Sequence, residues 1–252
     1  MISSRYHLDG LVKMAKRQLL LLSSSNVHGH EYLEYAAKDI CELLTLNNVS
    51  TVLFVPYALS NHEEYLKKVE QPFRRWGFQV ESIHNQNPLE AVKQAEAIFI
   101  GGGNTFRLLK TLYDLNLVEA INERVLKNGI PYIGSSAGTN VATRSIHTTN
   151  DMPIVYPPSF DSLNLVPFNI NPHYQDPDDG SKHKGETREE RIMQYLEEKD
   201  SSHVLGLREG ATLSVNGNTA VLKGLIGARL FIKGQKPREI DVGSDLSYLL
   251  KE

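Results

Sequence analysis

Residues 131–138 read Pro131-Tyr132-Ile133-Gly134-Ser135-Ser136-Ala137-Gly138, an apolar run that ends in a turn of small residues. The residues that follow, 139–143, can open a helix. A strand, a tight glycine-flanked turn and a helix in this order are typical of a parallel α/β sheet. Within this stretch the pattern Gly134-x-Ser136-x-Gly138 places one serine at the carboxyl end of the predicted strand.

Short apolar runs alternate with amphipathic stretches throughout the first half of the chain. Most of the runs lack polar alternation, as is typical of strands that are covered on both faces. The sequence therefore predicts an α/β fold, with a mostly parallel central sheet and helices on both faces. The predicted strands cover residues 18–23, 50–56, 77–84, 95–100 and 131–134, and the predicted helices cover residues 31–46, 62–76, 88–94, 105–112 and 117–128.

The last third of the chain follows a different pattern. Residues 150–185 are rich in Pro, Asp and Asn and weakly periodic, which is typical of a long functional loop. A helix is predicted over residues 186–198, and Asn216-Gly217 is a strong hairpin signal. We expect antiparallel strands near the C-terminus that extend the same domain, over residues 204–207, 212–215, 219–223 and 228–233.

Length and composition limit the class of protein. The 252 residues suit a single domain over residues 18–252, preceded by an N-terminal extension, residues 1–17, whose order the sequence leaves open. A formal net charge of -3 does not indicate the strongly basic surface that binds nucleic acid or an anionic membrane. The single cysteine, Cys41, excludes an intrachain disulfide and suits a reducing compartment. With no apolar run typical of a signal peptide or membrane helix, we expect a cytoplasmic protein.

The turn at Ser136 predicts a nucleophile. Flanking glycines permit the sharp, strained backbone that lifts a serine side chain out of a sheet edge. The helix that follows would direct the Ala137 N–H towards a developing oxyanion. The alternative is a small-residue packing turn, because Gly-x-Ser-x-Gly also occurs by chance. The order of strand, turn and helix favours the nucleophile.

A glycine run, Gly101-Gly102-Gly103, follows the predicted strand over residues 95–100. It lacks the lysine or the third spaced glycine of a phosphate-binding loop, so nucleotide binding is disfavoured. A glycine loop on a neighbouring strand is the usual second donor to an oxyanion hole. We therefore predict Gly102 or Gly103 as that donor, against the alternative of a glycine turn needed only for its backbone conformation.

A serine nucleophile needs a histidine base and a carboxylate that orients it. Spacing favours His173 only slightly over His28, His30 and His84, each of which borders a predicted strand. For the carboxylate, the sequence leaves two candidates open. Asp151 lies soon after the predicted elbow helix, and Glu209 closes a late strand.

Five separate motifs, in order and spacing, resemble those of peptidase E, a family of cytoplasmic serine peptidases that cleave dipeptides beginning with aspartate. The likeness extends from about Gln18 into the late strands. The motifs are the glycine run, Gly134-Ser135-Ser136-Ala137-Gly138-Thr139-Asn140, Thr148-Thr149-Asn150-Asp151-Met152-Pro153-Ile154-Val155, Asn171-Pro172-His173 and His183-Lys184-Gly185-Glu186-Thr187-Arg188.

The resemblance implies a fold related to class I glutamine amidotransferases, with Ser136 as nucleophile and His173 as base. It implies Asp151 as the usual orienting carboxylate and Glu209 as its rival. It also implies that Arg188 binds the substrate aspartate, although from the sequence alone Thr187-Arg188-Glu189-Glu190-Arg191 is typical of a salt-bridged helix start.

The predicted function is hydrolysis of Asp-Xaa dipeptides through an acyl-enzyme on Ser136. Two alternatives remain: a related serine hydrolase such as a cyanophycinase-like β-aspartyl peptidase, and a non-catalytic small-molecule binder of the same fold. We expect a small peptide as the substrate, no cofactor and no metal, because no metal-ligand motif is present. We expect no nucleic-acid or membrane partner, and a monomer or homodimer.

Overall fold

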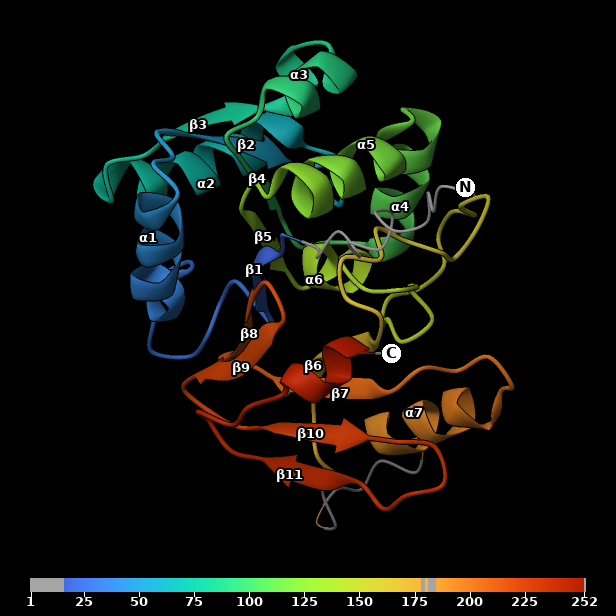
Figure 1. Cartoon of the computed structure of the whole chain (residues 1–252). Helices are drawn as coiled ribbons and strands as arrows, with labels where there is room; N and C mark the ends of the chain where they lie inside the picture. The colour runs from blue at the N-terminus through green and yellow to red at the C-terminus, as the bar shows by residue number, and fades with distance from the viewer. Residues whose placement is uncertain (1–15, 178–179, 181–184, 252) are drawn as a thin grey trace, which may run out of the picture.

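The computed structural model describes residues 16–177, 180 and 185–251. Residues 1–15, which make up most of the predicted N-terminal extension, lie outside the described residues, as do His183 and Lys184 of the fifth motif. Figure 1 shows two layers of strands, with helices gathered mainly around the larger sheet. None of the described helices is long and apolar enough to cross a membrane.

The larger sheet has seven strands in the order β3-β2-β4-β5-β1-β8-β9. The first five of these pair in parallel. The hairpin β8–β9 adds to β1 in the antiparallel direction, and its two-residue loop is Gly217-Asn218, one residue later than the predicted Asn216-Gly217. The strands are β1 (Gln18–Leu22), β2 (Thr51–Val55), β3 (Gln79–Ser82), β4 (Ala97–Ile100), β5 (Tyr132–Ser135), β8 (Ala211–Asn216) and β9 (Thr219–Gly224).

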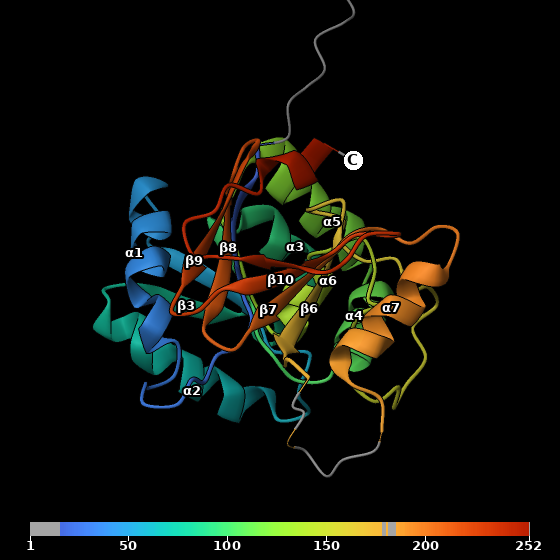
Figure 2. The ribbon, with the colours of Figure 1, turned by 90° about the horizontal axis from the view of Figure 1, so that it is seen from below.

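Helices cover both faces of this sheet, which confirms the predicted fold class. Side chains of α1 (Ala37–Leu46) and α2 (His62–Arg75) pack on one face, with Leu20, Phe54 and Phe99. The opposite face packs against the other helices (Figure 2). These are α3 (Pro88–Gln94), α4 (Thr105–Asp114), α5 (Leu117–Glu123), which continues into a π-helical turn (Arg124–Asn128), and α6 (Ala137–Val141).

The smaller sheet has four strands in the order β11-β10-β7-β6 and carries α7 (Arg188–Glu197). The expected antiparallel pairing holds for β7–β10 and β10–β11, but β6 pairs with β7 in parallel. The sequence pattern predicted neither β6, which lies within the loop expected over residues 150–185, nor β11, which is short and mostly exposed and therefore has no apolar periodicity. The bounds are β6 (Asn169–Tyr174), β7 (Val204–Arg208), β10 (Ala228–Phe231) and β11 (Arg238–Ile240).

The two sheets meet where their strands end. Glu209 and Gly210 alone link β7 of the smaller sheet to β8 of the larger one, and Gly210 makes the turn with a φ of 90°. The carboxyl ends of β4 and β5, which carry the glycine run and the serine turn, lie at the same edge of the larger sheet. Ligand sites of open α/β sheets form at this edge.

Candidate active site

Ser136 lies in the turn between β5 and α6, as predicted. Its φ of 53° and ψ of -109° are unfavourable for a residue with a side chain. Gly134 and Gly138 make the turn possible, because a Cβ on Gly138 would lie 2.0 Å from the Ile100 carbonyl oxygen. The strained turn leaves Ser136 half-exposed between buried neighbours.

Hydrogen bonds to the end of β1 hold this turn. The Ser136 N–H donates to the Leu22 carbonyl (3.1 Å). The Thr139 hydroxyl contacts the same carbonyl at 2.6 Å and that of Gly134 at 2.9 Å. Because Leu22 and Thr139 are buried, the neighbouring strand holds the turn against relaxation of its strained backbone.

His173 lies near the end of β6, at a break in the β6–β7 register between Asn171 and Tyr174. Its own φ is 54°, so a bulge directs its ring away from the regular strand alternation. The His173 N–H donates to the Ser23 hydroxyl (2.9 Å), which donates to the Leu207 carbonyl (2.8 Å). Ser23, at the end of β1, therefore ties the histidine backbone to both sheets, a role that no sequence motif indicated.

Residues of the third motif also support the histidine segment. Asn150 donates its side-chain amide to the Pro172 carbonyl at 2.6 Å. Asn171 donates to the Thr148 carbonyl at 2.7 Å and to the Asn150 side chain at 2.9 Å. These contacts explain why two motifs more than twenty residues apart in the sequence act as one structural unit.

Ser136, His173 and Glu209 come together across the two sheets. The Ser136 Oγ lies 2.9 Å from His173 Nε2, and His173 Nδ1 lies 2.8 Å from Glu209 Oε1. The side chains of His173 and Glu209 are 37% and 52% exposed, so the pair is open to solvent. A hydroxyl, an imidazole and a carboxylate in this order can activate the hydroxyl as a nucleophile.

Asp151, the other carboxylate that the sequence left open, lies elsewhere. Its Oδ2 accepts hydrogen bonds from the Thr105 N–H (2.7 Å) and the Thr105 hydroxyl (2.6 Å) at the first turn of α4. A carboxylate there satisfies a free backbone donor and complements the helix dipole. The contacts of the two carboxylates thus favour Glu209 over Asp151 as the group that orients the imidazole.

The glycine run lies next to the Ser136 turn. A Cβ on Gly102 would lie 3.1 Å from the Ser136 Cβ and 3.4 Å from the Ser135 carbonyl oxygen. Gly103 has a φ of 138°, and a Cβ there would lie 2.6 Å from the Ala58 carbonyl oxygen. Both glycines line a cavity of about 1030 Å³ that also contains Ser136, His173 and Glu209. Gly102 therefore lies beside the Ser136 side chain, whereas Gly103 packs against Ala58 at the same cavity.

We expect Gly102→Ala to impair catalysis without unfolding the protein. The new methyl group would press on the Ser136 side chain and move its hydroxyl relative to His173. A displacement of that kind should lower kcat/KM by roughly 10- to 100-fold, while the melting temperature changes by less than about 4 °C. Kinetics and thermal unfolding of the purified variant check this, and wild-type kcat/KM would contradict the placement of Gly102.

Comparison with known proteins shows which family the chain belongs to. The sequence pattern of Peptidase family S51 matches residues 19–223, which include Ser136, His173 and Glu209. The chain belongs to peptidase family S51. The serine turn and the order of the motifs predicted a peptidase, and membership of this family confirms that prediction.

Two relatives resemble this S51 peptidase over nearly all of its length. "Probable alpha-aspartyl dipeptidase" of Drosophila melanogaster is 54% identical over 237 residues, covering 94% of this chain and 98% of its own. "Peptidase E" of Streptomyces coelicolor is 54% identical over 233 residues, covering 92% and 94%. The crystal structure of a peptidase from an acI-B1 Actinobacterium, at 20% identity, has the same fold, with a TM-score of 0.70 over 93% of this chain and 97% of that one.

Arg188, the predicted substrate-binding cation of the S51 peptidase, is the first residue of α7. Burial lowers the pKa of its guanidinium, as does the charge of Arg191, while Asp151 opposes the shift. Asp151, whose charge opposes the shift, is hydrogen-bonded to Thr105, which follows the glycine run and Asn104. Arg188 is not one of the described residues that line the 1030 Å³ cavity.

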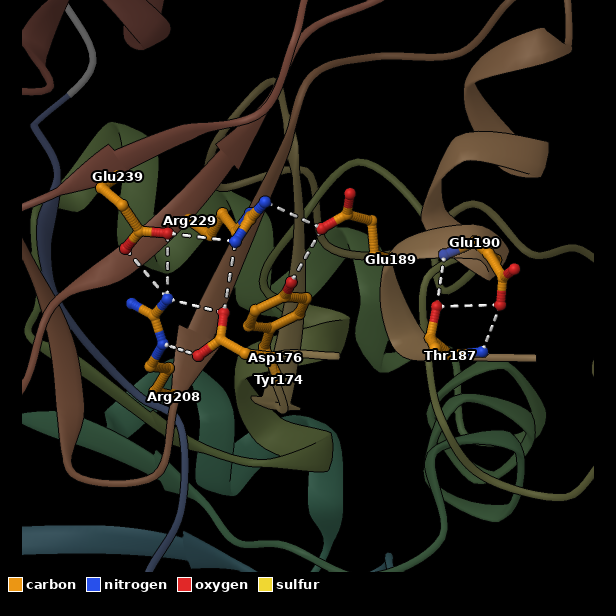
Figure 3. Close-up of polar contacts among 8 residues, drawn as sticks. All are labelled: Tyr174, Asp176, Thr187, Glu189, Glu190, Arg208, Arg229 and Glu239. Atoms are coloured by element: carbon orange, nitrogen blue, oxygen red, sulfur yellow. Dashed lines mark hydrogen bonds and ion pairs between the residues drawn. The ribbon is translucent and has the colours of Figure 1, made fainter. Parts of the chain in front are cut away.

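A network of ion pairs fixes the start of α7 to the smaller sheet (Figure 3). Glu189, next to Arg188, contacts Arg229 of β10 at 3.1 Å and the Tyr174 hydroxyl at 3.4 Å. A capping box closes the same helix start, because Thr187 and Glu190 exchange hydrogen bonds. The strand that carries His173 and the helix that begins with Arg188 are therefore joined.

The same network reaches the carboxylate side of the S51 site. Arg208 donates two hydrogen bonds to Asp176, both 2.7 Å, and another to Glu239. These contacts raise the pKa of Arg208 and lower that of Asp176. Since Arg208 precedes Glu209 directly, the ion pair with Asp176 fixes the end of β7 beside the histidine segment (Figure 3).

The described residues offer little to a metal ion. No group of three or more His, Cys, Asp or Glu side chains that could hold one is found among them. The remaining candidate histidines have other contacts: His84 lies 2.8 Å from Glu63, and His30 lies 3.8 Å from Glu34. Neither they nor His28 line the cavity at Ser136.

Proposed function

We propose that this S51 peptidase hydrolyses dipeptides with an N-terminal aspartate through an acyl-enzyme on Ser136. The observation that carries the proposal is the chain of two contacts from the Ser136 Oγ through the His173 imidazole to the Glu209 carboxylate, 2.9 and 2.8 Å long. The names of the two relatives at 54% identity support the substrate class.

In the proposed mechanism, His173 Nε2 takes the proton of the Ser136 hydroxyl while the oxygen attacks the carbonyl carbon of the aspartyl residue. The oxyanion accepts hydrogen bonds from the Ala137 N–H and an N–H of the Gly102–Gly103 loop. His173 then gives its proton to the leaving amine, and the peptide C–N bond breaks. A water molecule, activated by the same imidazole, releases free aspartate.

Glu209 has the role of an orienting group in this mechanism. By accepting a hydrogen bond from the Nδ1–H of His173, it keeps Nε2 free to receive the proton from Ser136. It also stabilises the imidazolium that forms after the proton transfer. Asp151 acts indirectly, since it fixes the start of α4 beside the glycine loop and offsets the charge of Arg188.

Arg188 is the proposed partner of the substrate's aspartyl side chain. A guanidinium matches a carboxylate in a planar, two-point contact. Its lowered pKa reflects a partly desolvated charge at the rigid start of α7, and such a charge gains most from an anionic ligand. The contacts of Glu189 with Arg229 and Tyr174 hold the start of α7 at a fixed position relative to β6.

A panel of dipeptides with varied first residues tests the function. The protein should hydrolyse Asp-Leu and leave Leu-Leu, Ala-Leu and Asn-Leu largely intact. The β-linked isomer of Asp-Leu belongs in the same panel, because faster cleavage of that isomer would indicate a β-aspartyl peptidase. No cleavage, combined with no labelling of Ser136 by a fluorophosphonate, would indicate a non-catalytic binder.

Arg188→Ala should lower kcat/KM for Asp-Leu by roughly 100-fold, because a charge-assisted contact to the substrate is lost. The low rate on Leu-Leu should stay within about twofold, since that substrate lacks the side-chain carboxylate. Arg191→Ala is the matched control, as this exposed arginine lies one turn further along α7. Undiminished hydrolysis of Asp-Leu by Arg188→Ala would show that another group binds the aspartate.

We also expect the protein to work in the cytoplasm, as a monomer or homodimer that acts on small peptides. A single cysteine and a net charge of -3 support that setting. Fractionation of cells that express the tagged full chain and light scattering of the purified protein test these two expectations separately.

A further inference from the structure

Arg107 is a half-buried arginine that no step of the proposed mechanism uses. It is the third residue of α4, and its backbone N–H donates to the side chain of Asn104, which caps the helix. The glycine loop directly precedes Asn104, so Arg107 is fixed to the element that carries the proposed oxyanion donors. Its side chain lines the same cavity as Ser136 and His173.

The guanidinium of Arg107 lacks the partners that four other half-buried arginines have. Arg17 and Arg124 donate to main-chain carbonyl groups. Arg208 and Arg229 contact carboxylates. Among the described residues, no side-chain hydrogen bond or ion pair involves Arg107. A partly buried cation gains stability from an anion in its vicinity, which points to an anionic ligand.

The cavity lining that includes Arg107 carries charges of both signs, because Glu64 belongs to it together with Lys67 and Lys68. Burial lowers the pKa of His62, at the start of α2, and the nearby charges of His84 and Arg107 add to that effect. Lys67 and Lys68 line the same cavity, but both are exposed, and Lys68 lies over the Tyr32 ring at 4.6 Å. Arg107 is therefore the cavity cation that is both partly desolvated and anchored close to the glycine loop.

A dipeptide that begins with aspartate carries two carboxylates, one on the aspartyl side chain and one at its C-terminus. The first is assigned to Arg188 in the proposed function. The second lies on the leaving residue, a few bonds beyond the amide that Ser136 attacks. A longer peptide or an amidated dipeptide has no carboxylate at that place, so a cation that binds it selects dipeptides.

We propose that Arg107 binds the free α-carboxylate of the leaving residue and thereby restricts the enzyme to dipeptides. The inference rests on the proposed function, because it concerns the second half of the same substrate. The planar guanidinium would contact both carboxylate oxygens. The contact also draws the scissile carbonyl carbon towards the glycine loop, since Arg107 and that loop belong to one rigid segment.

Asp-Leu and its C-terminal amide, Asp-Leu-NH2, test the inference as a matched pair of substrates. The wild-type enzyme should cleave Asp-Leu with a kcat/KM roughly 10- to 100-fold above that of the amide, as expected for one charge-assisted contact. Arg107→Met should lose this preference, because it lowers the rate on Asp-Leu by that factor and leaves the amide within about twofold. Arg107→Lys should retain an intermediate preference, since it keeps the charge but not the planar fork.

Two further variants separate this role from others. Arg188→Ala should lower cleavage of both substrates by the same factor, because both retain the aspartyl side chain. Arg74→Met, at an exposed arginine of α2 that does not line the cavity, should leave both rates unchanged. If Arg107→Met lowers both rates equally, or if it preserves the preference for Asp-Leu, the assignment is overturned.

Binding gives a readout that is independent of catalysis. In the Ser136→Ala background, calorimetric titration should give a Kd for Asp-Leu that is tighter than that for Asp-Leu-NH2, and Arg107→Met should abolish the difference. Failure of the proposed function has a different signature, because the wild-type enzyme would then cleave neither aspartyl substrate. An equal Kd for both ligands in the Ser136→Ala protein would exclude a carboxylate site at Arg107.

Discussion

Ser136→Ala should lower kcat/KM for Asp-Leu by on the order of 10⁴- to 10⁶-fold, because removal of a serine nucleophile removes the covalent pathway as a whole. The variant should also resist labelling by a fluorophosphonate probe that modifies the wild-type enzyme. Circular dichroism and thermal unfolding should be close to those of the wild type, since among the described residues the hydroxyl is hydrogen-bonded to the His173 ring alone. Mass spectrometry of the labelled peptide locates the modified residue.

Ser135→Ala provides the matched control for this prediction. The Ser135 side chain is buried, and its Oγ lies 2.6 Å from that of Ser25, whereas the His173 imidazole contacts Ser136. This variant should keep its labelling and most of its activity. If labelling disappears in Ser135→Ala and persists in Ser136→Ala, the nucleophile is Ser135 and the prediction is wrong.

Glu209→Gln should lower kcat by on the order of 10³-fold, with little change in KM. The amide no longer holds the His173 tautomer or stabilises the imidazolium, which in buried triads costs about 10⁴-fold. We expect a smaller effect here, because the Glu209 side chain is 52% exposed and water can replace part of the contact. Steady-state kinetics on Asp-Leu measure both parameters.

Asp151→Asn is the comparison that decides between the two carboxylates. It should lower the unfolding free energy by about 1 kcal/mol, because the start of α4 loses a charged acceptor. Its kcat should fall much less than that of Glu209→Gln. A larger loss of kcat in Asp151→Asn, at unchanged stability, would restore the aspartate as the orienting group.

Local patterns in the sequence were sufficient for much of the fold. The serine turn, the glycine run and the hairpin at Asn216-Gly217 each depend on residues that are adjacent along the chain, and the structure has the first two where they were predicted and the hairpin loop one residue later. The parallel order of the larger sheet also follows from the alternation of strands and helices. Element bounds differ by a few residues, as in α1, which begins at Ala37 rather than at residue 31.

Contacts between segments that are distant along the chain could not be predicted from the sequence. The choice between Asp151 and Glu209 depends on the parallel pairing of β6 with β7, which brings Arg208 opposite Tyr174. No periodicity specifies that register. Ser23 and Arg107 were missed for the same reason, because each is an ordinary residue in sequence and acquires its role from a neighbour in space.

The chain passes from the smaller to the larger sheet at Glu209 and Gly210, and this link affects how the protein loses activity in denaturant. The hydroxyl at 136 follows a strand of one sheet, the imidazole belongs to the edge strand of the other, and the carboxylate lies in the link between the two. A slight shear between the two layers would separate them while every helix and strand stayed intact. Mild denaturant should therefore abolish catalytic activity at a concentration at which the helical circular dichroism is still unchanged. The rate of turnover is then the most sensitive measure of how the two layers fit together.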